Sequence, residues 1–379
     1  MFDLAAEIRL DRKAIDAAIR RVIDSAKFVQ GIEVERLEAE FATYVGASHA
    51  IGVGSGTAAL HLALLACGIG VGDEVITAPN TDSPTASVIS QVGATIVFAD
   101  IDPDTFNIDP AAIERTITPR TKAIIPVHLF GNPAPMTEIL ALAERHRLLV
   151  IEDATLAVGA TVDGRRVGSA GTAGCFSFAP SKILGGFGDG GMVTTNDARI
   201  AEELRILRNY GHSLAMNRDF WGLLGVDNWE IVREGYNERL DEIQAAILRV
   251  KLARLEDRLE ARRRAAARLD EALAGLPIRL PSEAPNGRHV FRAYTILLDD
   301  RDRAREFLAG RGISTRLYYT PPLHLQPAFR HLGHRSGAFP AAELTAGRML
   351  SLPIYPSMSS GEVDRVATAL ADWQRVQET

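Results

Sequence analysis

The stretch Gly174–Met192, GCFSFAPSKILGGFGDGGM, holds a lysine in a setting that suits covalent chemistry. Lys182 closes a Ser-Phe-x-x-Ser-Lys run and precedes a glycine-dense turn, whose backbone can bend close to a ligand. A lysine amine forms Schiff bases with carbonyl compounds, and pyridoxal phosphate (PLP) is the electron-sink cofactor that uses this chemistry. The stretch therefore suggests a PLP lysine, although by itself it also fits a surface lysine beside a glycine loop.

A carboxylate that could serve the pyridinium nitrogen of such a cofactor lies in the run VIEDA. Asp153 ends an apolar stretch, where a charge is costly unless it is paired. A protonated ring nitrogen would be that partner, and the ion pair would keep the ring an electron sink. A helix N-cap is an interpretation of Asp153 with equal weight.

A phosphate site is indicated by the run GSGTAAL, residues Gly54–Leu60, where a strand pattern ends and a helix pattern begins. The free N–H groups and the positive dipole end of a helix start both favour an anion. Thr57 can add a hydroxyl and Ser177 a second one. Glycine turns before helices are common, so this signal gains weight from lying at the same sheet edge as Asp153 and Lys182.

Short β-rich runs alternate with helical patterns over the first half of the chain. Such an alternation of apolar strands and helices predicts a mostly parallel sheet covered on both faces. Ligands in these sheets bind beyond the carboxyl ends of the strands, where the polar residues above are expected. The expected strands are Ala50–Val53, Glu74–Ala78, Thr95–Asp100, Ala123–His128, Leu148–Asp153, Gly174–Phe178 and Gly191–Thr195. The expected helices include Asp11–Ser25, Glu33–Val45, Thr57–Cys67, Ser83–Gln91, Pro110–Thr116 and Pro135–His146.

The second half of the chain begins with a long segment of little periodicity, Ser213–Glu234, which contains Trp221, Gly222, Gly225 and Trp229. A loop of this length in a compact chain is more often functional than not. The next segment, Glu238–Leu276, has a helical pattern almost throughout. We expect the C-terminal part to contain the strands Val290–Leu298 and Ser314–Tyr319, the helices Arg301–Arg311 and Ser360–Gln377, and a loop at Thr320–Pro340.

Composition restricts the class of protein. With 379 residues, the chain exceeds the size of a single core, and we expect a helical segment 1–30, a large cofactor-binding domain 31–250 and a small domain 251–379. The net charge of -6 gives no indication of a basic surface that would bind nucleic acid. We expect the first residues to form an amphipathic helix and not a signal peptide, and no apolar run in the sequence predicts a membrane span. Cys67 and Cys175 have no metal-binding or disulfide spacing, which suits the cytoplasm.

Many motifs, in one order over nearly the full length, resemble the DegT/DnrJ/EryC1/StrS family of PLP-dependent aminotransferases. They are GSGTAALHLALLACGIGVGDEVITAP, DIDPDTFNIDP, ITPRTKAIIPVHLFGNP, VIEDA, FSFAPSK, GYNERLDEIQAAIL, PLHLQPAF and AAELTAGRMLSLPIYP. The resemblance implies the α/β fold of the fold-type-I (aspartate aminotransferase-like) PLP-dependent transferases. In this fold a large domain with a mostly parallel seven-stranded sheet is joined to a smaller α+β C-terminal domain.

The resemblance also assigns roles to individual residues. Lys182 matches the Schiff-base lysine and Asp153 the partner of the pyridine nitrogen. Asn237 matches an asparagine that reaches the cofactor phosphate of the neighbouring subunit, which implies a homodimer with shared active sites. The positions that match the cofactor phosphate ligands are Gly56, Thr57, Ala58 and Ser177, and those near the substrate are Tyr319 and His324.

The function implied by the resemblance is transfer of an amino group from L-glutamate or L-glutamine to a keto group of a nucleotide-linked deoxysugar. PLP would alternate with pyridoxamine phosphate, and no metal is expected. Such an enzyme would serve amino-sugar biosynthesis in a natural-product or surface-polysaccharide pathway. Alternatives are a cyclitol aminotransferase of the same family and a PLP-binding regulatory protein without turnover. Dehydratases of the family carry histidine at the lysine position, so Lys182 favours transamination.

Three departures from the family pattern predict an atypical cofactor pocket. The run Thr81-Asp82-Ser83-Pro84 lacks the aromatic residue that usually stacks on the ring. Leu156 and Val158 stand where glutamine and histidine are common, and Ala179 fills a slot that is often aromatic or histidine. We therefore expect unusual ring contacts. Candidates for contact with the acceptor are Asp82, Arg165, Arg166 and the Ser213–Glu234 loop.

Overall fold

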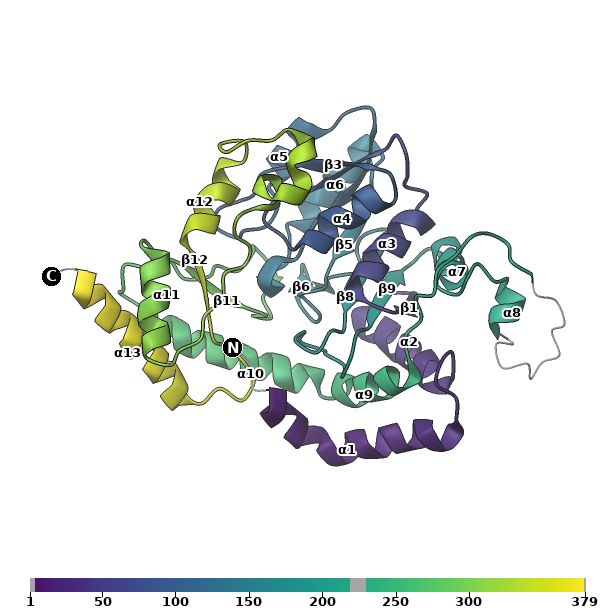
Figure 1. Ribbon diagram of the computed structural model, residues 1–379, viewed down its shortest axis with the longest axis horizontal. Coiled ribbons are helices and arrows are strands. Elements are labelled where there is room, and N and C mark those ends of the chain that lie inside the picture. Colours follow the sequence, from purple (N-terminus) through teal and green to yellow (C-terminus); the bar gives the residue numbers. More distant parts are fainter. Residues whose placement is uncertain (1–3, 219–229, 378–379) are drawn as a thin grey trace.

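A seven-stranded sheet forms the centre of the chain in the computed structural model, which describes residues 4–218 and 230–377 (Figure 1). The strand order is β1-β9-β8-β5-β4-β2-β3, and only β9 runs antiparallel to its neighbours. All seven strands were predicted from the sequence, as was the mostly parallel sheet. Their bounds are β1 His49–Val53, β2 Glu74–Thr77, β3 Thr95–Phe98, β4 Thr121–Ile125, β5 Leu149–Asp153, β8 Ala173–Ser177 and β9 Gly191–Thr195.

Helices cover both faces of this sheet because its strands are apolar on both sides. On β8, Cys175 packs into one buried cluster, whereas the next residue, Phe176, packs into another. On β9, Val193 and Met192 divide between the same two clusters. Successive side chains of a strand point to opposite faces, so each face of the sheet has its own core.

The helices of this half of the chain begin at residues suited to that position. Asp82, Asp109 and Asp197 each accept a backbone hydrogen bond at the start of a helix. The predicted helices therefore form close to their expected bounds. They are α2 Ile32–Val45, α3 Gly56–Ala66, α4 Ser83–Gln91, α5 Pro110–Thr116, α6 Met136–His146 and α7 Ala198–Leu207.

The N-terminal helix α1, Leu4–Ser25, lies along α9, Glu242–Leu252 (Figure 1). Ala18 and Val22 of α1 are buried against Ala246. The segment 238–276, expected to be helical almost throughout, is interrupted between α9 and α10, Leu255–Leu273. Before α9, the helix α8 occupies Leu214–Arg218. The predicted features Trp221, Gly222, Gly225 and Trp229 lie outside the described residues.

A second, two-stranded sheet carries the C-terminal part, with its own buried cluster between Ala265 and Trp373. Its strands are β11 Tyr294–Leu297 and β12 Met349–Leu352. The strand predicted at Ser314–Tyr319 is wrong, since only Arg316 makes an isolated bridge there. Strand β12 was missed. The helices of this part are α11 Arg301–Gly310, α12 Pro340–Arg348 and α13 Ser360–Gln377.

The segment between Leu323 and Ala342 packs against the core of the large sheet, although it follows the second sheet's first strand in the chain. It contains the short helices η2 Leu323–Leu325 and η3 Pro327–Leu332, where a loop was expected. Smaller elements complete the fold: η1 Leu129–Gly131, β6 Thr161–Val162, β7 Arg165–Arg166 and β10 Gly287–Arg288. Within the described ranges, no helix has the length and apolar character needed to span a membrane.

Candidate active site

A cavity of about 170 Å³ lies at the carboxyl ends of the central strands. Asp153 ends β5 and Ser177 ends β8, so these two neighbouring parallel strands bring both side chains to one edge. The lining combines polar and charged side chains with a few apolar ones. The lining includes Ser55, Gly56, Thr57, Thr81, Asp82, Thr85, Asp153, Leu156, Ser177, Lys182, Asp189 and Tyr319.

Lys182 reaches this cavity from a turn that follows β8. Its backbone N–H donates to the Ala179 carbonyl at 2.8 Å. Burial and the nearby positive charge of Arg292 lower the pKa of the Lys182 amine to about 8, while Asp153 and Asp82 oppose this shift. The amine therefore has a substantial neutral, nucleophilic fraction near neutral pH.

Asp153 is held in one orientation at the floor of the cavity. Its side chain is buried, and Oδ2 accepts a hydrogen bond of 2.8 Å from the Thr85 hydroxyl. Oδ1 accepts one of 3.1 Å from the backbone N–H of Thr155. Turns and not a helix follow β5, so the helix-cap interpretation of Asp153 is not realised. The carboxylate instead presents a buried negative charge beside the lysine.

The start of α3 forms the third part of the site. Ser55 caps the helix, because its Oγ accepts a 3.0 Å hydrogen bond from the N–H of Ala58. A Cβ on Gly56 would lie 2.6 Å from the Cβ of Ser177, so only glycine lets the helix start approach the end of β8 this closely. Gly56 and Thr57 line the cavity, whereas Ala58 is buried behind them. The positive end of the α3 dipole thus faces the cavity.

The wall opposite the sheet comes from a distant part of the chain. Tyr319 is half-buried there and packs in the same apolar cluster as Leu156 and Phe130. Burial, followed by the charge of Asp82, raises the pKa of the Tyr319 hydroxyl, which stays protonated. The aromatic residue that the family usually has near Asp82 is lacking, as the sequence indicates, and Tyr319, Leu156 and Leu60 are among the large side chains that line the cavity.

Arg292 is a residue near the site that the sequence did not reveal. Its side chain is buried, and its positive charge acts on both Lys182 and Tyr319. The arginine follows Val290, whose N–H donates to the Gly131 carbonyl at 3.0 Å. This contact between residues far apart in sequence brings Arg292 to the site, and no local motif indicates it.

Glu152 and His128 form a buried pair on the other face of β5. Glu152 accepts a hydrogen bond of 3.0 Å from the His128 ring and further ones from backbone N–H groups that include Gly168 and Gly171. Burial would raise the pKa of Glu152, but these donors hold it below its usual range. The pair ties β4 and β5 to the loop before β8. It supports the strand that carries Asp153 and does not enter the cavity.

Two predicted site residues lie away from this cavity. His324 is 1% exposed, and its Nε2 lies 3.0 Å from Oε1 of Glu343. It is therefore buried within the segment that packs against the large sheet. Asn237 is exposed and forms a backbone bridge with Asn209. The structure therefore brings Lys182, Asp153, Gly56, Thr57, Ser177 and Tyr319 together around the cavity and leaves Ala58, His324 and Asn237 outside it.

The arginines considered as acceptor contacts differ in their surroundings. Arg166 donates to the Tyr44 carbonyl at 2.9 Å and to the Glu256 carboxylate at 3.0 Å. It therefore ties the β6–β7 hairpin to two helices. Arg165 is exposed.

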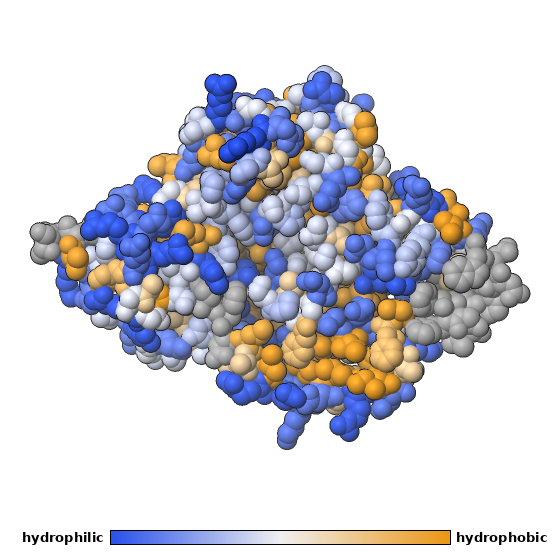
Figure 2. All heavy atoms as spheres, in the orientation of Figure 1, coloured by the Kyte–Doolittle hydropathy of each residue, from blue (hydrophilic) through white to orange (hydrophobic). Residues whose placement is uncertain are grey.

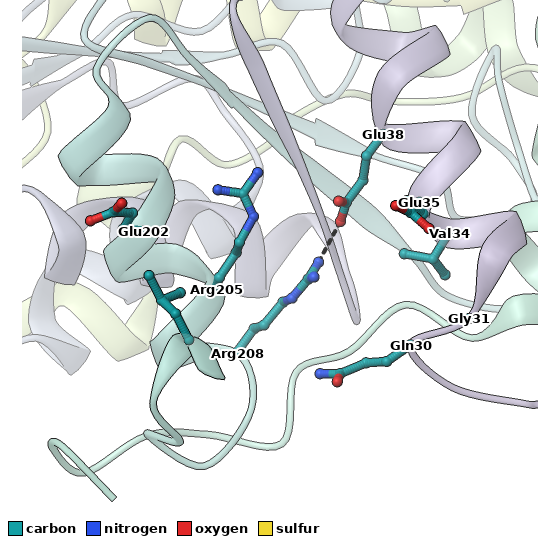
Figure 3. Close-up of a pocket in the computed structure, with 9 residues that line it drawn as sticks. Gln30, Gly31, Val34, Glu35, Glu38, Glu202, Arg205 and Arg208 are labelled. Carbon is teal, nitrogen blue, oxygen red and sulfur yellow. Dashed lines mark hydrogen bonds and ion pairs between the residues drawn. The ribbon is translucent and has the colours of Figure 1, made fainter. Parts of the chain in front are cut away.

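A larger cavity of about 430 Å³ lies between α2 and α7, away from the lysine (Figure 3). Its charged side chains partly neutralise one another, since Arg208, directly after α7, pairs with Glu38 of α2 and also donates to the Gly52 carbonyl at 2.7 Å. None of the residues that line it is a nucleophile of the kind that Lys182 provides. The smaller cavity is therefore the candidate active site.

Within residues 4–218 and 230–377, no group of three or more His, Cys, Asp and Glu side chains is arranged to hold a metal ion. Cys67 and Cys175 are free, and burial raises the pKa of each thiol. Both thiols are thus protonated and unreactive.

Residues 10–371 match the model of the DegT/DnrJ/EryC1/StrS aminotransferase family. A protein of Acidithiobacillus ferrooxidans, UDP-N-acetyl-3-dehydro-alpha-D-glucosamine 3-aminotransferase, is 46% identical over 98% of this chain and 96% of its own length. A protein of Geobacillus stearothermophilus, named pleiotropic regulatory protein, is 45% identical over 99% of this chain and 98% of its own.

Solved structures agree with these sequence matches. Streptomyces venezuelae DesV in complex with a ketimine intermediate superposes with a TM-score of 0.93, at 43% identity, over 98% of this chain and 97% of its own. NtdA from Bacillus subtilis with bound cofactor PMP gives a TM-score of 0.88 at 30% identity, over 96% of this chain and 82% of its own.

Proposed function

Because the chain belongs to the DegT/DnrJ/EryC1/StrS aminotransferase family, we propose that it moves an amino group from L-glutamate or L-glutamine to a keto group of a nucleotide-linked deoxysugar. The observation that carries this proposal is that Lys182 and Asp153 line one cavity beside the start of α3. The predicted family, its fold type and the aminotransferase activity are confirmed by the matches. The reaction would serve amino-sugar biosynthesis.

The cavity fits pyridoxal 5′-phosphate. Asp153 supplies a buried carboxylate for the ring nitrogen, and Gly56 leaves room for a close approach between α3 and Ser177. Gly56, Thr57 and Ser177 would hold the phosphate at the positive end of α3, with Ala58 contributing through the same helix turn. When bound, the cofactor would supply an electron sink for the transfer reaction.

Lys182 is assigned two tasks. Its amine, with a pKa of about 8, is poised to bind the cofactor and, once released, to hold and return the proton of the reacting carbon. Asp153 would keep the nitrogen of a bound cofactor ring protonated. The Thr85 hydroxyl, at 2.8 Å from Oδ2, holds the Asp153 carboxylate in one orientation, as this role requires.

A homodimer with shared active sites completes the proposal. Asn237 is exposed and lies outside the cavity of its own chain, as expected of a residue that reaches a partner's phosphate site. Figure 2 shows apolar side chains gathered over α9, above α1. Phe28 and Phe187, both exposed, contact α9 through their backbones, Phe28 at Glu242 and Phe187 at Gln244. Such an apolar face fits a second copy of the chain.

The remaining assignments follow from the same proposal. Tyr319 would contact the substrate directly. His324 would act on the substrate side by holding, through Glu343, the segment between Pro321 and Ala342. We assign a helical segment 1–30, a large domain 31–250 and a small domain 251–379, and a cytoplasmic location.

The proposal is tested in two steps. The protein with PLP and L-glutamate or L-glutamine should release the corresponding 2-oxo acid in an amount close to that of the enzyme. The amino-loaded enzyme should then be screened against keto-sugar nucleotides and against ketocyclitols. Amination of a keto-sugar nucleotide is the expected result, and amination of ketocyclitols alone would replace the sugar by a cyclitol as substrate.

A second candidate function is a PLP-binding regulator without turnover. The name of the Geobacillus stearothermophilus relative favours it, and so does the replacement of the usual polar side chains by Leu156 and Val158. The 2-oxo acid assay separates the two functions. A protein that binds PLP at Lys182 but releases no 2-oxo acid from either donor would be a regulator.

A further inference from the structure

The glycine turn, residues 183–190, follows Lys182 and folds back over the residues before it. The N–H of Gly186 donates to the Phe178 carbonyl at 2.7 Å. A Cβ on Gly185 would lie 2.7 Å from the Pro180 carbonyl oxygen and 2.8 Å from that of Ala179. The glycine turn is thus in direct contact with the short segment that carries Lys182.

Two side chains of α9 hold the glycine turn from the side away from the cavity. Gln244 and Lys251 are seven residues apart, which places them on one face of the helix. The Gln244 Oε1 accepts a hydrogen bond of 2.7 Å from the N–H of Phe187. The Lys251 Nζ donates to the Gly185 carbonyl and lies 5.1 Å from the centre of the Phe187 ring. Neither side chain lines the cavity.

Burial of the Lys251 amine costs free energy that a residue with only a packing role would not cost. The side chain of Lys251 is 2% exposed, and a buried amine needs a hydrogen-bond partner to compensate for lost hydration. Burial and the charge of Arg258 lower the pKa of Lys251 to about 8, while Glu7 and Asp11 oppose the shift. An apolar side chain would fill the same space without this cost. The amine is therefore explained by its contact with Gly185.

We propose that Lys251, together with Gln244, is a positioning residue for the transfer reaction, which fixes the glycine turn and through it the direction of Lys182. The inference rests on the proposed function of Lys182 as the cofactor lysine. The Lys251 amine touches neither substrate nor cofactor. Its effect passes through the Gly185 carbonyl, then through the contact of that glycine with Ala179 and Pro180.

The test compares two substitutions of one residue. Lys251→Met keeps the length of the side chain and removes the donor, whereas Lys251→Gln keeps an N–H donor without the charge. Exposed Lys122→Met serves as the matched control. Hydrogen exchange of the amides of residues 183–190 is measured in the apoprotein and in the PLP-loaded enzyme, beside kcat, KM and the visible absorbance of the bound cofactor.

In Lys251→Met, we expect exchange of the glycine turn to rise at least about tenfold and kcat to fall about tenfold, with KM for the donor nearly unchanged. In Lys251→Gln, both the exchange of the glycine turn and kcat should be close to their wild-type values. Gln244→Met should raise amide exchange at Phe187 and its neighbours. If Lys251→Met does not fold, the exchange measured in Gln244→Met tests the inference in its place. Unchanged exchange in both Lys251→Met and Gln244→Met would overturn the inference.

The measurement on the apoprotein distinguishes a failure of this inference from a failure of the proposed function. Exchange of the glycine turn is measured without cofactor or turnover, so it reports on Lys251 even if the chain has another activity. If exchange rises in Lys251→Met while kcat and the absorbance of the cofactor stay at wild-type values, the glycine turn does not position Lys182, and the positioning role is wrong.

Discussion

Lys182 and Lys251 lie on opposite sides of the glycine turn and share an electrostatic feature. Burial, with a nearby arginine, lowers the pKa of each amine to about 8. The surroundings differ, because Lys182 faces a cavity with Asp153 on its floor, whereas Lys251 donates to a backbone carbonyl. A lowered pKa therefore reports burial, and only the geometry of the neighbours distinguishes a reacting lysine from a supporting one.

The loss of Lys182 should have the largest effect. Lys182→Ala removes both the cofactor bond and the proton carrier, so kcat should fall by at least about 10³-fold. Release of the 2-oxo acid from the donor measures this, with Lys122→Ala as control. Transamination retained in Lys182→Ala would show that Lys182 is not the reacting lysine and does not differ from Lys251 in this respect.

The carboxylate on the cavity floor should have the next largest effect. Asp153→Asn keeps the shape and the hydrogen bond from Thr85 but loses the charge, so kcat/KM should fall about 10²-fold. Asp109→Asn is the control, because that residue caps α5 and does not line the cavity. Equal losses in both variants would show that general electrostatics, and not a specific partner for the ring nitrogen, accounts for the activity.

The pKa of Lys182 predicts how the apoprotein binds PLP at different pH values. Only the neutral amine is nucleophilic, so the rate of attachment should rise about tenfold per pH unit below pH 8 and level off above it. With the ordinary lysine pKa of 10.5, the rise would continue into strongly alkaline solution. Rapid-mixing absorbance measures the rate.

The same experiment distinguishes the two buried lysines. Borohydride reduction after mixing should trap PLP on the peptide that contains Lys182 and not on the one with Lys251, whose buried amine donates to the Gly185 carbonyl. Trapping at Lys251 would contradict the geometric distinction.

The smallest effect is expected from the helix start. Gly56→Ala places a Cβ against Ser177, and overpacking of this kind costs about 1–3 kcal/mol of the free energy of unfolding. Gly347→Ala, inside α12, is the control, because a Cβ at this position meets nothing within 4 Å. This substitution should stabilise the folded protein slightly. Thermal unfolding of the apoprotein measures both, and equal melting temperatures for the two variants would show that the close approach is not required.

Local patterns predicted the large sheet well because each strand there is a continuous apolar run bounded by turns. The C-terminal sheet was predicted less well. Strand β12, Met349–Leu352, follows α12 directly, and its identity depends on pairing with the distant β11. The predicted strand Ser314–Tyr319 has β propensity, but of its residues only Arg316 pairs with β12, in an isolated bridge to Ser351.

The candidate site shows the same division. The sequence by itself determined Lys182, Asp153 and the start of α3, because the carboxyl ends of parallel strands meet at one edge and each of them lies at or shortly after a strand end. Only the tertiary structure decided the placement of Tyr319, Leu156 and Arg292 against that edge and of Lys251 behind the glycine turn. Those contacts join segments that are distant in the chain, and their geometry depends on packing that no local pattern encodes.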